Sequence, residues 1–194
     1  DMADAQHRYG VIPTTSPEYV VFEGPVMDAF AESPEWGGSL VIFPFMYYET
    51  YGDDSLIKKY YQHMRRYTDY LKTRADNGIL SFGLGDWYDY GDFRAGFSRN
   101  TPVPLVATAH YYMTVMYLIK AARMVGNEFD VRYYSSLAYD IMVAFNKRFL
   151  DSNTAQYGTG SQASNALPIF LQMIQSTGDK GDYTPDASLA AKVL

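Results

Sequence analysis

Aromatic and acidic residues gather in two glycine-rich turns of this 194-residue chain. The turns are Pro34-Glu-Trp-Gly-Gly38 and Gly83-Leu-Gly-Asp-Trp-Tyr-Asp-Tyr-Gly-Asp92, and they hold the only two tryptophans, Trp36 and Trp87. A glycine-rich turn cannot build a core, so we expect both tryptophans on a binding surface. A flat aromatic face packs on apolar C–H patches, and carboxylates accept hydrogen bonds from hydroxyls. The pattern predicts a site for a neutral, hydroxyl-rich ligand, although both tryptophans could instead plug their loops as core residues.

The carboxylates in these turns have more than one interpretation. Asp86 either accepts a hydrogen bond from a ligand hydroxyl or caps its own turn. Glu35 is a candidate catalytic carboxylate, but a glutamate in the first turn of a helix is also expected from the helix dipole. Asp89 and Asp92 are expected to be solvated loop acids.

Composition excludes several classes of function. The net charge of -6 and the pI of about 5.0 disfavour nucleic-acid binding, which needs a basic surface. Cysteine is absent, and the three histidines (His7, His63 and His110) lie far apart in sequence, so neither a metal site nor a cofactor is expected. No run reaches the roughly 18 apolar residues of a membrane span, and no membrane partner is expected. The compartment stays open between the cytoplasm and a periplasmic or secreted location.

Hydrophobic periodicity predicts an all-α fold. We expect residues 1–33 to be a lead-in that is mostly loop, with one short strand at residues 19–22. Pro44 is expected to kink the first helix or to mark its first turn. Gly52 and Gly126 are expected to end helices, and Asn127 and either Asp53 or Asp54 to cap the next ones. The expected helices are residues 35–51, 53–76, 104–125, 128–149, 162–175 and 185–194.

Two parts of the chain repeat. Aligning Gly52 with Gly126, an offset of 126 − 52 = 74 residues, pairs apolar positions such as Leu71 and Phe145. A repeat of this length fits one pair of long helices plus a long loop. Stacked helical hairpins with long aromatic loops at one end predict part of an (α/α) toroid.

His110, on a helix face rich in tyrosine, is expected to be a core histidine, and Gln162 and Asn165 are expected to be helix caps.

An ordered set of short motifs resembles one known family, the catalytic domain of bacterial α-L-rhamnosidases of glycoside hydrolase family 78. The resemblance covers about residues 10–175. The two tryptophan motifs are separated by 87 − 36 = 51 residues. The motifs are Gly10-Val-Ile-Pro13, Glu35-Trp-Gly37, Phe43-Pro-Phe-Met-Tyr-Tyr48, Tyr51-Gly-Asp53, Tyr60-Tyr-Gln-His-Met64, Gly85-Asp-Trp87, Thr101-Pro102, Ser161-Gln162 and Asn165-Ala166.

The resemblance implies an (α/α)6 barrel that hydrolyses terminal α-L-rhamnose with inversion. One carboxylic acid protonates the leaving oxygen, and a second carboxylate, roughly 6.5–9.5 Å away, activates water. The resemblance places the acid upstream of the Trp36 motif and the base downstream of Leu194, so both principal catalytic residues are expected outside this chain. Trp36, Trp87 and Asp86 are then the expected substrate-binding residues. The partners that the resemblance implies are a rhamnose-containing oligosaccharide or glycoside and the rest of the same polypeptide.

One position departs from the family pattern. The family usually reads Trp-Gly-Asp-Ala where this chain has Trp36-Gly-Gly-Ser39, so an acidic residue is missing at Gly38. This departure favours a second hypothesis, a non-catalytic carbohydrate-binding relative. A third is a helical-repeat scaffold whose aromatic loops contact protein. Both ends of the chain look cut, and we expect residues 1–194 to be a fragment of a larger catalytic domain that is inactive alone.

Overall fold

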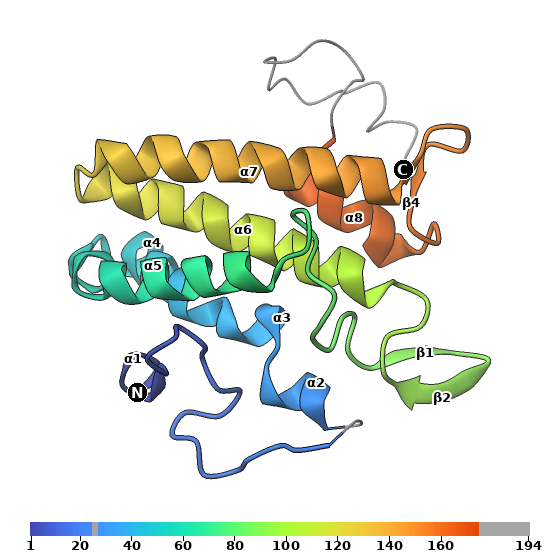
Figure 1. The fold of residues 1–194 in the computed structure, drawn as a ribbon, viewed down its shortest axis with the longest axis horizontal. Coiled ribbons are helices and arrows are strands. Elements are labelled where there is room, and N and C mark those ends of the chain that lie inside the picture. Colours follow the sequence, from blue (N-terminus) through green and yellow to red (C-terminus); the bar gives the residue numbers. More distant parts are fainter. Residues whose placement is uncertain (25–26, 175–194) are drawn as a thin grey trace.

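The computed structural model describes residues 1–24 and 27–174, and helix α6 (Val103–Met124) lies at its centre (Figure 1). This helix is apolar around most of its circumference, which is why its neighbours can bury it on several sides. The elements that pack against it are α3 (Pro34–Gly37), α4 (Ser39–Tyr51), α5 (Ser55–Arg74), α7 (Glu128–Phe149) and α8 (Gln162–Phe170).

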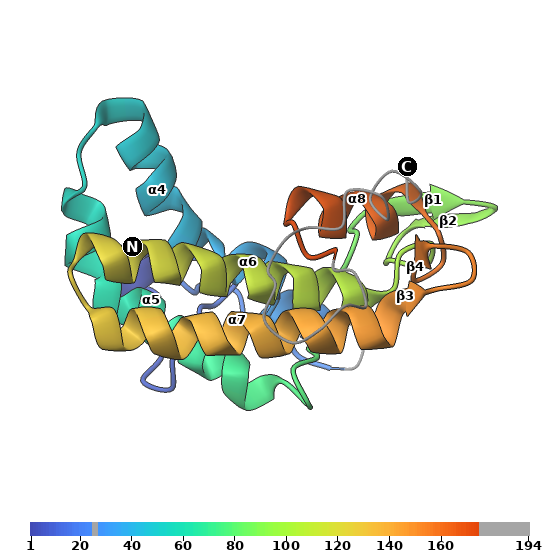
Figure 2. The ribbon, with the colours of Figure 1, turned by 90° about the horizontal axis from the view of Figure 1, so that it is seen from above.

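The long helices form two consecutive hairpins, α4 with α5 and α6 with α7. Figure 2 shows α4 and α8 on one side of α6, and α5 and α7 on the other. The positions paired by the 74-residue repeat occupy equivalent places, since Leu71 of α5 and Phe145 of α7 are both fully buried. The all-α class is confirmed, and the stacked hairpins form part of an (α/α) toroid.

Helix ends follow the local chemistry of the chain. Gly52 and Gly126 both adopt the left-handed conformation, with φ of 69° and 74°, as expected for residues that end helices. The Asn127 side chain accepts a hydrogen bond from the Asp130 backbone N–H at 3.1 Å and so caps α7. At α5 the Asp53 carboxylate accepts from the Ser55 N–H at 2.8 Å. This bond lowers the pKa of Asp53 below its usual range.

Several predicted boundaries were wrong. The helix expected over residues 35–51 is split at Gly38 into α3 and α4, and Pro44 lies inside α4 rather than in its first turn. Residues 19–22 form no strand; the lead-in instead holds the short helices α1 (Met2–Ala5) and α2 (Asp28–Ala31). Helix α8 ends at Phe170, before the predicted residue 175, and the helix expected over residues 185–194 lies outside the described residues.

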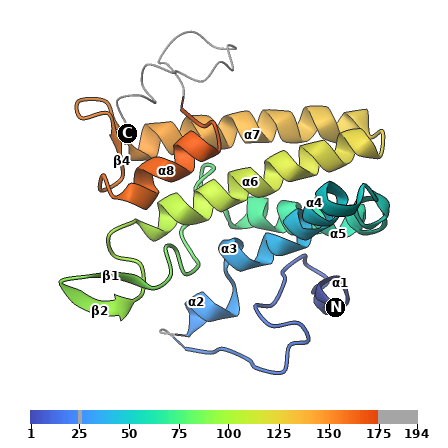
Figure 3. The ribbon, with the colours of Figure 1, turned by 180° about the vertical axis from the view of Figure 1, so that it is seen from behind.

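Two small antiparallel hairpins interrupt the segments predicted as plain loops. Strands β1 (Asp89–Gly91) and β2 (Phe93–Gly96) pair within the loop before α6. Strands β3 (Leu150–Asp151) and β4 (Gln156–Tyr157) pair between α7 and α8. Figure 3 shows both hairpins at the end of α6 where that helix begins. No helix within the described part of the chain is long and apolar enough to cross a membrane.

Candidate functional site

The two tryptophans meet at one residue, Phe30 of α2. The Phe30 ring lies 5.0 Å from the Trp87 ring, edge to face, and 6.5 Å from the Trp36 ring, measured between centroids. Each tryptophan keeps 38% of its surface exposed. The turns of Trp36 and Trp87, far apart in sequence, therefore present their aromatic rings on one shared, solvent-accessible surface. Neither tryptophan plugs a core of its own.

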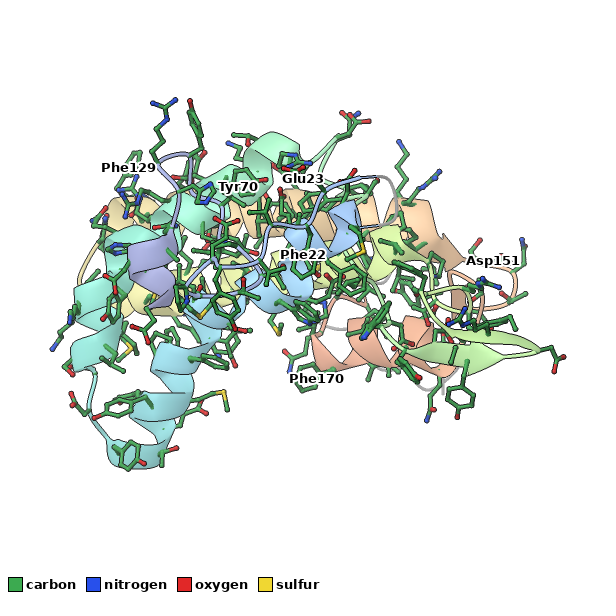
Figure 4. The ribbon with its side chains drawn as sticks, turned by 90° about the horizontal axis from the view of Figure 1, so that it is seen from below. Phe22, Glu23, Tyr70, Phe129, Asp151 and Phe170 are labelled. Atoms are coloured by element: carbon green, nitrogen blue, oxygen red, sulfur yellow. The ribbon has the colours of Figure 1, made fainter. Side chains whose placement is uncertain are left out.

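Further aromatic rings extend this surface. Phe97, which follows β2, packs edge to face against both Trp87 and Phe30, at 5.3 and 5.8 Å. Phe22, labelled in Figure 4, lies beside the short helices α2 and α3, with its ring 5.8 Å from Phe30. We call the residues Phe22, Phe30, Trp36, Trp87 and Phe97 the aromatic cluster.

Glu35 joins the two tryptophan turns through hydrogen bonds. Its Oε1 accepts from the Gly85 backbone N–H at 3.1 Å, and its Oε2 accepts from the Ser33 hydroxyl. The Ser33 oxygen in turn receives a longer bond, 3.4 Å, from the Leu84 N–H. Both oxygens of the carboxylate thus accept hydrogen bonds, Oε1 from the neighbouring turn and Oε2 from Ser33 in its own segment.

Close backbone packing explains two of the glycines. At Gly83, where φ is 115°, an added Cβ would lie 2.7 Å from Oε2 of Glu35. At Gly37 it would lie 2.3 Å from the hydroxyl of Tyr67, a side chain of α5 that is only 2% exposed. Burial raises the pKa of Tyr67 well above its usual range, so this phenol stays neutral against the turn. Larger residues at these positions would push the turns away from each other and from α5.

Asp86 points into its own loop. Its Oδ2 accepts a bond from the Thr101 hydroxyl at 3.2 Å, and its N–H donates to Ser98 Oγ at the same distance. Thr101 also lies 2.8 Å from the hydroxyl of Ser161, the N-cap of α8, so Asp86 is linked to the start of that helix. Among the described residues, Oδ1 of Asp86 accepts no hydrogen bond, which leaves one oxygen for a ligand hydroxyl.

Asp89 corrects an expectation. It is buried, with 8% of its surface exposed, rather than solvated. Its carboxylate accepts bonds from the backbone N–H groups of Arg99 and Asn100, at 2.7 and 2.5 Å, and from the Asn100 side chain. These bonds, chiefly that from Arg99, lower the pKa of Asp89. Asp92 is exposed, as expected.

The remaining candidates brace the structure. His110 of α6 is half-buried, and its Nδ1 lies 2.9 Å from the Val106 carbonyl oxygen of the same helix. Ser161, not Gln162, caps α8 by accepting from the Ser164 N–H. Asn165 is not a cap either: its Oδ1 accepts from the Tyr157 N–H at 2.9 Å and ties α8 to β4. Within residues 1–24 and 27–174, no group of three or more His, Asp and Glu side chains is placed to hold a metal ion.

Sequence reasoning missed Phe30, Phe97 and Ser33. Phe30 lies in the segment read as loop, and nothing local marks it as the contact between two tryptophans. One weak signal existed: Phe30 and Phe97 are large apolar residues in segments predicted to lack a long helix, where a ring needs a partner to leave water.

Comparison with known proteins identifies relatives along the whole chain. The family model described as the bacterial alpha-L-rhamnosidase 6 hairpin glycosidase domain matches residues 1–193. An alpha-L-rhamnosidase of Formosa agariphila is 29% identical over 121 residues, which are 60% of this chain and 12% of the relative. One of Streptomyces avermitilis is 24% identical over 176 residues, or 90% of this chain and 15% of the relative. The chain therefore spans less than a fifth of the curated relatives that it matches.

Solved structures agree on the fold. The alpha-L-rhamnosidase from Dictyoglumus thermophilum superposes with a TM-score of 0.78 at 29% identity, covering 90% of this chain and 19% of that structure. The Streptomyces avermitilis enzyme, solved in complex with L-rhamnose, gives a TM-score of 0.79 at 20% identity and covers 100% of this chain and 16% of its own. With the family model matching nearly every residue, the chain belongs to the bacterial alpha-L-rhamnosidase six-hairpin glycosidase family.

Proposed function

We propose that this chain supplies one wall of the sugar pocket in an inverting glycoside hydrolase that releases terminal α-L-rhamnose. The observation that carries the proposal is the shared surface of Trp36 and Trp87, whose rings meet through Phe30 and remain 38% exposed. Exposed aromatic faces of this size suit the apolar side of a sugar ring and its methyl group. The substrate class follows from the relatives, which are named alpha-L-rhamnosidases.

Asp86 serves as the polar partner in this proposal. Its Oδ2 is held by Thr101, which fixes the carboxylate beside Trp87, while Oδ1 remains available to accept a bond from a sugar hydroxyl. An ionised carboxylate makes a stronger acceptor than a neutral group, so this bond would orient the sugar on the aromatic surface.

The catalytic acid and base belong to other parts of the longer polypeptide. In an inverting mechanism they flank the scissile bond, one protonating the leaving oxygen and the other activating water. Glu35 does not suit either role, because both of its oxygens already accept hydrogen bonds, one from Gly85 in the neighbouring turn and one from Ser33 in its own segment. Residues 1–194 then bind and orient the sugar, and the flanking segments perform the chemistry.

A non-catalytic carbohydrate-binding relative is the second candidate, and Gly38 favours it. Its φ of -56° suits any residue, so the backbone conformation does not require glycine. An added Cβ would nevertheless fit tightly, 3.1 Å from the Pro34 carbonyl oxygen and 3.3 Å from Oγ1 of Thr114. The full polypeptide distinguishes the two: turnover of an aryl α-L-rhamnoside supports the hydrolase, and binding of L-rhamnose without turnover supports the second candidate.

Substituting Trp87→Ala in the full polypeptide tests the proposed contact. Loss of one aromatic wall is expected to weaken L-rhamnose binding about tenfold, measured by titration calorimetry. Tyr90→Ala is the matched control, since Tyr90 lies in the same loop, is 79% exposed and is not in the aromatic cluster. An unchanged dissociation constant for Trp87→Ala would remove this residue from the pocket.

A further inference from the structure

Glu35 occupies an unusual position for an acidic residue beside a sugar site. It directly precedes Trp36 in the chain, yet its carboxylate reaches into the other tryptophan turn, where the Gly85 N–H donates to Oε1 at 3.1 Å. Gly85 lies two residues before Trp87, and its own carbonyl oxygen accepts from the Trp87 N–H at 2.9 Å. A short chain of covalent and hydrogen bonds thus connects the two tryptophans through one carboxylate.

The surroundings of this carboxylate make the connection stiff. Oε2 accepts from the Ser33 hydroxyl, and Ser33 is only 3% exposed. An added Cβ on Gly83 would lie 2.7 Å from Oε2 and 2.8 Å from Cδ of Pro34, so the two turns are already in contact at this point. Hydrogen bonds to an ionised acceptor are stronger than neutral ones, and a partly buried carboxylate loses more if a donor is removed.

We propose that Glu35 is a positioning residue that sets the spacing and relative orientation of Trp36 and Trp87, and so the width of the aromatic surface offered to the sugar. The inference rests on the sugar-binding role proposed above for the two tryptophans. Glu35 acts through Gly85 and Ser33 and does not exchange a proton with the substrate. Phe30 lies between the rings, and the Glu35 carboxylate is hydrogen-bonded on both sides, to Gly85 in the Trp87 turn and to Ser33 directly before its own turn.

The first test does not depend on sugar. In the full polypeptide, Glu35→Gln replaces one carboxylate oxygen by an NH2 group, which cannot accept a bond. We expect faster amide hydrogen exchange in peptides that contain Gly85, measured by mass spectrometry. Glu49→Gln is the control, because Glu49 is an exposed glutamate of α4, away from both turns. Unchanged exchange in Glu35→Gln would overturn the proposal.

The second test asks whether Glu35 acts through Trp87. Glu35→Gln alone is expected to weaken L-rhamnose binding roughly tenfold. In a double variant with Trp87→Ala, the Glu35→Gln substitution should raise the dissociation constant little further, because the ring that Glu35 positions is already gone. If the double variant instead shows a loss of affinity equal to the product of the two single losses, the substitutions act independently and the positioning role is overturned. If exchange rises but Trp87→Ala itself leaves binding unchanged, the proposed sugar contact fails, and the role of Glu35 in sugar binding fails with it.

Kinetics separate positioning from acid–base chemistry. We expect Glu35→Gln to raise KM while kcat and the pH profile of kcat/KM stay close to those of the parent protein. A fall of about 10²–10⁴ in kcat with loss of one limb of the pH profile would instead make Glu35 a general acid or base. Ser33→Ala provides a milder variant if Glu35→Gln folds poorly, since it removes the bond to Oε2 and the longer bond from the Leu84 N–H but leaves the bond from Gly85 in place. Ser33→Ala should also speed amide exchange near Gly85 and raise KM, each by less than Glu35→Gln does. If neither quantity changes, the result counts against the proposal.

Discussion

Several carboxylates in this molecule accept hydrogen bonds from backbone N–H groups. Asp53 binds the Ser55 N–H at the start of α5, Asp89 binds those of Arg99 and Asn100, and Glu35 binds that of Gly85. Spacing in the sequence predicts the first case, because the acceptor and the donor are two residues apart. It cannot predict the other two, where the partners are separated by 10 to 50 residues. For the same reason, Asp89 was expected to be solvated and is buried.

Asp89 makes the acid stability of its loop testable. Its pKa is lowered in the folded state, so its contribution to stability is present above the unfolded pKa of about 3.9 and is lost as the pH falls through the folded pKa. Asp89→Asn is expected to lower stability at pH 7 and to flatten the loss of stability below about pH 4. Urea midpoints measured across pH 2–7 check this, with exposed Asp92→Asn as the control. An equally steep acid limb in Asp89→Asn would contradict the assignment.

At the scale of elements, the helices were predictable and the hairpins were not. Periodic apolar residues and the glycines at positions 52 and 126 are local signals, and they located α5, α6 and α7 closely. Strands β1 and β2 are three and four residues long, and part of their stability comes from the Asp89 contacts with residues that follow them. Helix α3 separates from α4 at Gly38, where the chain turns to bring Trp36 to the surface. These features depend on distant contacts that no local pattern records.

The cap of α7 carries a prediction of its own. The Asn127 side chain accepts from the Asp130 N–H and donates to the Asp130 carboxylate, at 3.1 and 2.8 Å. Asp130 is 2% exposed and also receives a bond from the Tyr61 hydroxyl, so the cap supports the contact between α7 and α5. Asn127→Ala is expected to cost about 1 kcal/mol of unfolding free energy, near the typical value for a helix cap. Asp53→Ala removes an exposed acceptor for the Ser55 N–H, directly before the N-cap residue Asp54 of α5, and should cost less in the same denaturation experiment. Equal losses would show that burial of Asp130 is irrelevant.

At the scale of the whole molecule, no element of residues 1–24 and 27–174 covers part of the apolar surface of α4. On α4, Phe43 and Met46 are 56% and 54% exposed, and Tyr51 is 71% exposed. Exposed apolar residues at helical spacing are typical of a face that packs against another element. The family description refers to six hairpins, and the chain spans 12% to 15% of the curated relatives considered above. Under the function proposed above, residues 1–194 form one part of a larger ring and carry the aromatic side of the pocket.

If residues 1–194 bind the sugar and other segments supply the acid and base, then residues 1–194 expressed alone will not hydrolyse aryl α-L-rhamnosides. In the proposed function the aromatic cluster and Asp86 bind the sugar, but binding without a paired acid and base gives no inverting hydrolysis. The measurement is release of the aryl group by the isolated chain, after circular dichroism has verified its helices, beside the full polypeptide at equal concentration. Turnover by the isolated chain near that of the full polypeptide would place the acid and base within residues 1–194. The carboxylates that the structure shows as braces, Glu35 first, would then have to be reconsidered as catalysts.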